Sequence, residues 1–151
     1  MVRIYVGTAL ILPAVATGAI AHSSPNTVDA PPAQTNTILV ASNLRIDTLT
    51  QAIERHPENA ALYNSRGWYN FLDGNYAETV ADYGRVIELG IENIDPVYHT
   101  SVYHVRGLAY VELGEKALAI ESLQVAGEMY RASGESAGVE AIEGAITQLS
   151  E

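Results

Sequence analysis

The sequence predicts an all-α protein built from antiparallel helix hairpins, and three observations point to this fold class. A segment recurs forty residues later, since Tyr-Asn-Ser-Arg-Gly at 63–67 returns as Tyr-His-Val-Arg-Gly at 103–107. Within each copy the apolar residues are spaced by three and four, which is the period of a helix with one buried face. A glycine, Gly74 or Gly114, interrupts each copy and marks a turn between two helices.

The first 21 residues have the layout of a secretory signal peptide. Arg3 precedes an uncharged, mostly apolar stretch that ends in Ala-Ile-Ala at 19–21, a typical cleavage pattern. Cleavage there predicts a mature chain that begins at His22 and functions in the periplasm or outside the cell. The alternative is a membrane anchor formed by residues 4–21, although Pro13 interrupts that stretch.

Residues 22–43 are expected to be a flexible linker, because they are rich in proline and serine and their first part has almost no apolar side chains. The run Ile-Leu-Val-Ala at 38–41 is compatible with a short extended piece or with the first turns of the next helix. The helical domain is therefore predicted over residues 44–151.

A single helix is predicted before the hairpins and another after them. Residues 44–56 place apolar side chains on one helical face, and Pro57 follows. At the other end, Ser136 is placed to cap a helix, and Glu140, Glu143 and Gln148 give that helix a polar outer face. Its apolar stripe is Val139, Ile142, Ile146 and Leu149. Such end helices are needed, because two hairpins alone leave apolar faces uncovered.

The two hairpins are predicted to begin near Ala60 and Thr100. The apolar stripes of their second helices are Tyr76, Val80, Tyr83, Ile87 and Leu89 in the first hairpin, and Leu118, Ile120, Leu123 and Ala126 in the second. Gly67 and Gly107 lie inside helical patterns, where glycine costs about 1 kcal/mol relative to alanine, so a close approach of a neighbouring helix is expected.

The two copies are separated by additional residues at 90–96. Gly90 is expected to stop the preceding helix. Asp95 followed by Pro96 predicts a cap and first turn that lengthen the first helix of the second hairpin.

These residues resemble the tetratricopeptide repeat family, whose 34-residue unit is a helix hairpin with aromatic, glycine and small residues at fixed offsets. The matching positions are Tyr63, Gly67, Gly74 and Tyr83 in the first copy and Tyr103, Gly107, Tyr110, Gly114, Ala119, Leu123 and Ala126 in the second. The first copy departs from the pattern at Asn70 and Thr79. The resemblance covers about residues 44–126. It implies a superhelix of two full repeats flanked by half-repeat capping helices, as in a small exported bacterial member of the family.

Composition and motifs argue against several functions. Eighteen acidic and eight basic residues give a net charge of -10, which opposes binding to nucleic acid. The absence of cysteine excludes disulfides, thiolate zinc sites and cysteine nucleophiles. No phosphate-binding loop, nucleophile elbow or paired histidine motif occurs, so we expect no enzyme, cofactor or metal site. A remote alternative is a metal carrier that uses the amine and ring of His22 at the mature N-terminus.

The family resemblance implies a concave groove, lined by the first helices of the hairpins, that binds a peptide or a helix of a partner protein. Carried over position by position, the groove residues would be Asn64, Trp68, Phe71, Leu72, Ser101, His104, Leu108 and Glu112. Trp68 is the only tryptophan, a residue type enriched among interface anchors, and its alternative is a core position. Chaperone-type members bind a carboxylate through lysine, but the only lysine here is Lys116 in a turn. An apolar or basic partner segment is therefore expected, in preference to an acidic one.

Two further interpretations stay open at this stage. Arg66 and Arg106 recur in register, and either pack between helices with an acidic partner or bind an anion of the ligand. The leading function is a protein interaction scaffold, and the alternative is a structural protein that acts through homo-oligomerisation.

Overall fold

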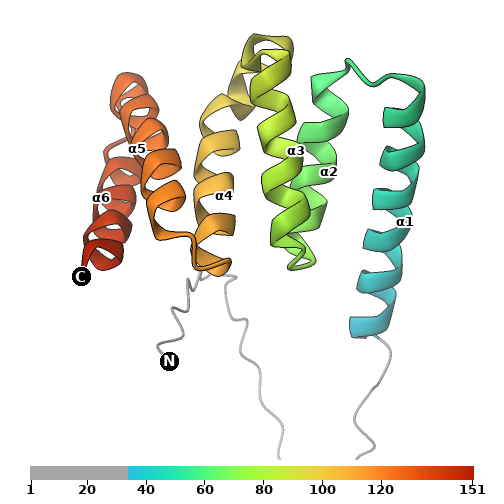
Figure 1. The fold of residues 1–151 in the computed structure, drawn as a ribbon, viewed down its shortest axis with the longest axis horizontal. Helices are drawn as coiled ribbons and strands as arrows, with labels where there is room; N and C mark the ends of the chain where they lie inside the picture. Colours follow the sequence, from blue (N-terminus) through green and yellow to red (C-terminus); the bar gives the residue numbers. More distant parts are fainter. Residues whose placement is uncertain (1–33) are drawn as a thin grey trace, which may run out of the picture. The chain divides into compact units, whose positions relative to one another are not determined.

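The computed structural model describes residues 34–151, and side chains from residue 43 onward. Over this part the chain forms six α-helices and two short 3-10 helices, and no strand occurs in it, so the all-α prediction is confirmed there (Figure 1). The elements are α1 (Gln34–Arg55), α2 (Ala60–Leu72), α3 (Tyr76–Leu89), η1 (Ile91–Asn93), η2 (Pro96–Tyr98), α4 (His99–Glu112), α5 (Lys116–Ser133) and α6 (Ser136–Ser150). The predicted signal peptide, His22 and residues 22–33 of the expected linker lie outside the described residues.

Each helix packs against the helices that precede and follow it in the chain. Figure 1 shows the six helices side by side in chain order. The predicted hairpins are α2 with α3, turning at Gly74, and α4 with α5, turning at Gly114. Helix α2 also contacts α4 directly, so the first helices of the two hairpins are neighbours.

Helix α1 begins at Gln34, well before the expected start at Leu44. No glycine or proline interrupts the chain between Gln34 and Arg55, and helix propagation adds one hydrogen bond for each further residue. The run at 38–41 is therefore helical and not extended. The linker prediction over residues 22–43 needs correction at 34–43.

The connection between α3 and α4 also differs from the prediction. Gly90 ends α3 as expected, with φ of 95° and ψ of 116°, a conformation that only glycine adopts readily. Two 3-10 turns follow, and the Asp95 side chain caps the second of them by accepting a hydrogen bond of 3.0 Å from the Val97 amide, with Pro96 in its first position, so the predicted cap and first turn are confirmed. This second turn runs directly into α4 at His99, and the predicted lengthening is therefore a 3-10 turn and not α-helix.

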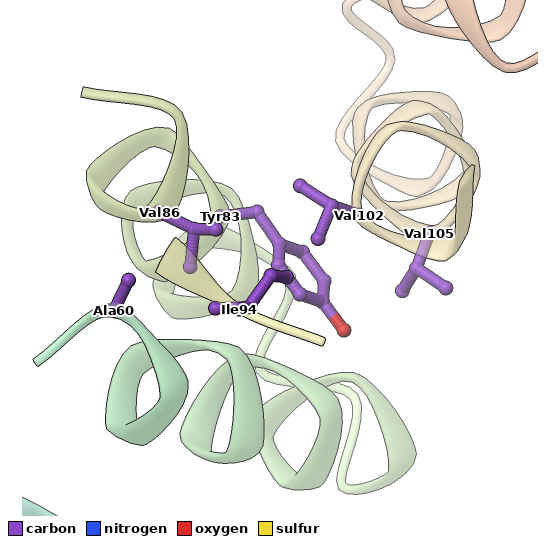
Figure 2. Close-up of a cluster of buried hydrophobic side chains, with 6 residues drawn as sticks. All are labelled: Ala60, Tyr83, Val86, Ile94, Val102 and Val105. Atoms are coloured by element: carbon purple, nitrogen blue, oxygen red, sulfur yellow. The ribbon is translucent and has the colours of Figure 1, made fainter. Parts of the chain in front are cut away.

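The apolar core consists of two clusters. The first joins α2, α3, the α3–α4 connection and α4, and its buried members are Ala60, Tyr83, Val86, Ile94, Val102 and Val105 (Figure 2). The second joins α5 to α6 through Leu123, Ala126 and Ile142. The α6 stripe is confirmed, because Ile146 and Leu149 pack on this second cluster beside Ile142. Ser136 does not cap α6 from outside, since it is the first residue within the helix.

Gly67 and Gly107 lie where paired helices come closest. A Cβ atom added to Gly107 would be 2.8 Å from Leu123 Cδ2 and 3.3 Å from the Leu123 amide nitrogen, and one added to Gly67 would be 3.2 Å from Asp82 Cβ. The expected close approach of a neighbouring helix is confirmed at both positions. The absence of a side chain there sets how tightly α2 packs on α3 and α4 on α5.

The buried faces of α3 and α5 only partly match the predicted stripes. On α3 the buried residues are Thr79, Asp82, Tyr83 and Val86. On α5, Leu118 is 41% exposed, while Ala119 and Ser122 are buried. Helical spacing selects a face only to within one residue, and here polar Asp82 and Ser122 are buried because side chains on α2 and α4 bond to them.

The last helix has an exposed polar side, on which Glu140, Glu143 and Gln148 lie as predicted. Arg131 of α5 donates a hydrogen bond of 3.1 Å to Glu143 at the edge of this surface. None of the helices between Gln34 and Glu151 is both long and apolar enough to cross a bilayer.

Candidate functional site

A cavity of about 500 Å³ lies between α2, the start of α4 and the α3–α4 connection. Its walls are formed by Ala61, Asn64, Ser65, Trp68, Tyr69, Tyr83, Ile94, Asp95, Tyr98 and Ser101. We call this cavity the Trp68 pocket. It is large enough for one long side chain or a small organic ligand, which places it in the usual size range of ligand sites.

Trp68 forms one wall of the pocket and is not a core residue, because 44% of it is exposed. Its ring stacks on Phe71, with the ring centroids 6.1 Å apart and the planes inclined by 23°. Phe71 in turn contacts the edge of Tyr76, at 5.8 Å between centroids. This aromatic row supports the indole, and 44% of Trp68 stays exposed for contact.

A second part of the wall comes from the α3–α4 connection. Ile94 is buried in the core cluster and fixes the connection, while Tyr98 is 49% exposed. Asp95 lies between them and keeps one carboxylate oxygen on the Val97 amide. Because Pro96 restricts the backbone next to Asp95, this wall has few conformations available to it.

Tyr83 of α3 forms the floor of the pocket. The residue is 1% exposed, its ring is packed in the core cluster, and Figure 2 shows its hydroxyl directed away from Ala60 and Val86. The hydroxyl makes no hydrogen bond within residues 43–151. Burial raises the pKa of Tyr83 well above its ordinary value, and the nearby Asp82 carboxylate raises it further, so the hydroxyl keeps its proton.

A buried polar network ties together the helices behind the pocket. Arg66 makes a bidentate ion pair with Asp82, with its Nη2 2.7 Å from Oδ1 and its Nε 3.0 Å from Oδ2. Asn70 donates to the same carboxylate at 3.1 Å, and Arg66 reaches Thr50 of α1 at 3.0 Å. The Asp82 hydrogen bond is the main cause that raises the pKa of Arg66. The network therefore links α1, α2 and α3, and the structural interpretation of Arg66 is confirmed.

Arg106 occupies the matching place in the second hairpin, but its partner differs. Its Nε donates to the hydroxyl of buried Ser122 at 3.1 Å, where the first hairpin has the Asp82 carboxylate. The guanidinium lies over the Tyr103 ring at 5.4 Å, just as Arg66 lies over Tyr63 at 5.8 Å. Arg106 thus packs between helices as expected, although a hydroxyl takes the place of the expected acid.

Three of the eight groove residues inferred from the sequence, Asn64, Trp68 and Ser101, line the pocket together. Phe71 supports Trp68 from the side and contacts the first core cluster. Leu72 is 59% exposed at the end of α2, and Glu112 is exposed at the end of α4. These two residues and half-buried Leu108 are not part of the pocket wall.

His104 is engaged within the fold. Its Nδ1 is 3.1 Å from the Tyr130 hydroxyl, and the two rings meet edge to face at 5.8 Å between centroids. Burial lowers the pKa of His104, so its ring stays neutral at physiological pH. Its position fits a contact between α4 and α5 better than a ligand contact.

Several pocket residues were not expected from the sequence. The sequence placed Tyr83 on the apolar stripe of its helix and Asp95 at a helix cap, and it gave Ser65 and Tyr69 no role in the groove. One signal was present, because the additional residues at 90–96 mark an insertion between the repeats, and insertions in repeat proteins often map to a binding face.

Comparison with known proteins finds a partial likeness. The chain is 38% identical over 82 residues to a protein named Protein SGT1 homolog from Oryza sativa subsp. japonica, a match that covers 54% of this chain and 21% of that protein. The matched region thus spans about a fifth of that relative's length. No known family profile matches the chain, and no solved structure matches it.

Proposed function

We propose that this protein is a tetratricopeptide-like interaction module that binds a basic or apolar segment of a partner protein at the Trp68 pocket. The partial match supports the repeat assignment, because SGT1 homologues belong to a family that contains tetratricopeptide repeats. The contact between α2 and α4 supports it as well, since stacked hairpins of this family bring successive first helices together.

The observation that carries the proposal is a preformed cavity with a half-exposed tryptophan on its wall. Trp68 and Tyr98 both line the pocket and are both about half exposed, and aromatic residues of this kind are the usual anchors of protein interfaces. The chain carries a net charge of -10, and Asp95 is the single ionisable carboxylate on the pocket wall. An acidic segment would be repelled, so charge complementarity favours a basic one.

The proposal is tested by selecting random displayed peptides against the purified protein and measuring the affinity of a labelled selected peptide by fluorescence anisotropy. We expect basic and apolar residues to be enriched. Trp68→Ala is expected to weaken binding by about 30-fold, the effect of losing one interface anchor of about 2 kcal/mol. Leu118→Ala is the matched control, because Leu118 is 41% exposed on α5 and does not line the pocket. Equal affinity of wild type and Trp68→Ala would contradict the proposal.

The proposal places this interaction in an exported compartment, since residues 1–21 have the layout of a signal peptide. The intact mass of protein recovered from the exported fraction tests this point. A mass that corresponds to a chain starting at His22 is expected, and an uncleaved chain found only in the cytoplasm would contradict it.

A further inference from the structure

Three of the polar side chains on the wall of the Trp68 pocket, Ser65, Ser101 and Asp95, can only accept hydrogen bonds from a ligand. Ser65 donates its hydroxyl hydrogen to the Ala61 carbonyl at 2.9 Å, and Ser101 donates its own to the Tyr98 carbonyl at 2.7 Å. A serine hydroxyl has one hydrogen and two lone pairs, so both side chains have only lone pairs left for a guest. Asp95 uses one carboxylate oxygen for the Val97 amide and has lone pairs to spare on the other.

The pocket floor adds a polar group that makes no hydrogen bond to the described residues and faces the cavity. The Tyr83 hydroxyl is almost fully buried and makes no hydrogen bond within residues 43–151, yet it forms part of the cavity wall. A ligand that makes a hydrogen bond to this hydroxyl would therefore bind more tightly than one that does not. The Asn64 amide, also on the wall, makes no hydrogen bond within the same residues.

The aromatic residues on the pocket wall favour a positively charged ligand. Trp68 and Tyr98 each expose about half of their surface, and the faces of such rings attract cations. The one carboxylate on the wall, Asp95, adds charge attraction to the same guest.

The protein's own arginines near the pocket do not act as this positively charged group. Arg66 is neutralised by Asp82 and does not line the cavity. Arg45 of α1 lies over Tyr69, with its guanidinium carbon 5.3 Å from the ring centre, and donates to the Tyr69 hydroxyl at 3.2 Å. Tyr69 therefore already has a cation on its ring, which leaves Trp68, Tyr98 and Asp95 as the groups for an incoming charge.

Building on the proposed function, we propose that the Trp68 pocket is a specificity site for one arginine side chain of the partner segment. Guanidinium has five donors in a planar fork and stacks on aromatic faces, which matches several separated acceptors between two rings better than the compact ammonium of lysine does. In this arrangement the Asp95 carboxylate pairs with the guanidinium charge, and the rings of Trp68 and Tyr98 pack against the guanidinium plane. The Tyr83 hydroxyl accepts a hydrogen bond from a guanidinium N–H.

The test uses the emission of Trp68, which is the only tryptophan and so reports on the pocket directly. The purified chain is titrated with the blocked peptide Ala-Ala-Arg-Ala-Ala, and with versions that carry citrulline, lysine, leucine or glutamate at the centre. Citrulline keeps the shape of arginine without its charge. We expect the arginine peptide to bind about tenfold more tightly than the citrulline peptide, and the glutamate peptide to be weakest.

Two variants separate recognition from folding. Asp95→Asn retains an acceptor for the Val97 amide and is expected to remove the preference of arginine over citrulline. Tyr83→Phe removes only the unpartnered hydroxyl, and is expected to weaken the arginine peptide by about threefold to tenfold without lowering the melting temperature. Glu121→Gln is the control, because it removes an exposed charge on α5 that is not on the pocket wall.

The possible outcomes distinguish failure of the arginine site from failure of the proposed interaction function. Equal affinity for arginine and citrulline, or an arginine preference that survives Asp95→Asn, would overturn the arginine site. If the leucine peptide binds best and changes the emission, the arginine site is wrong while the proposed interaction function stands. If no peptide changes the emission or gives heat in calorimetry up to millimolar concentration, both are wrong.

Discussion

At the scale of single residues, Gly107 shows how one missing side chain sets a helix contact. An added Cβ would meet Leu123 at 2.8 Å, closer than such atoms pack in proteins, whereas Gly84 in α3 has nothing within 4 Å of its added Cβ. We therefore expect Gly107→Ala to lower the free energy of unfolding by about 1–3 kcal/mol through overpacking. Gly84→Ala is expected to raise it by up to about 1 kcal/mol, through helix propensity alone. Urea denaturation of both variants measures this, and equal effects would refute the packing explanation.

His104 makes stability depend on pH. Burial lowers its pKa in the folded protein below the ordinary value of about 6.5, so on acidification the unfolded chain takes up the proton first. The unfolded state then binds more protons, and the free energy of unfolding falls as the pH drops through about 6.5 and levels off below the folded pKa.

The predicted consequence is measured by thermal melts between about pH 7.5 and pH 5.5. Wild type is expected to lose more stability over this range than His104→Asn, in which the side chain no longer titrates but retains an oxygen for Tyr130. An identical pH dependence of the two proteins would show that His104 does not contribute.

At the scale of elements, the backbone conformation of the connection between α3 and α4 determines the position of part of the pocket wall. Gly90 has φ of 95°, and an added Cβ would meet the Glu92 side chain as well as strain the backbone. Gly90→Ala is expected to cost about 1–3 kcal/mol in stability and to weaken peptide binding, because Ile94, Asp95 and Tyr98 follow directly after it.

A matched substitution separates these two effects. Gly114→Ala introduces the same kind of strain at φ of 78°, but in the turn between α4 and α5, away from the pocket wall. It is expected to lower the melting temperature without changing peptide affinity. If both substitutions weaken binding equally, the connection does not hold the pocket in shape.

At the scale of the whole helical unit, each helix contacts mainly its chain neighbours, so damage at one end is expected to stay local. Ile142 is 2% exposed and joins α6 to α5. Ile142→Ala is expected to cost about 2–5 kcal/mol, as other large-to-small core substitutions do. Hydrogen exchange should then show lost protection in α5 and α6, with protection in α2 and α3 retained. Uniform loss across all helices would indicate one cooperative unit instead.

The sequence predicted the helices well where the spacing of the apolar residues and the turn residues indicate the same boundaries. The turns at Gly74 and Gly114 and the buried stripe of α6 all follow from local rules that act within about four residues. It predicted the start of α1 poorly, because an apolar run such as 38–41 is locally compatible with two conformations. The stripe of α5 was only partly right, since which of two adjacent helix positions is buried depends on the helix that packs against it.

By itself, then, the sequence determined the helix order, the hairpin pairing and the acidic charge, since periodicity, turn residues and composition are properties of the chain alone. It also identified Trp68, Asn64 and Ser101 among the residues that line the pocket. Only the tertiary structure decided the rest of the pocket, because Asp95 and Tyr98 reach it through two 3-10 turns and Tyr83 reaches it from a different helix. A wall built from α2, α3, the α3–α4 connection and α4 depends on how their backbones pack, and no local pattern encodes that packing.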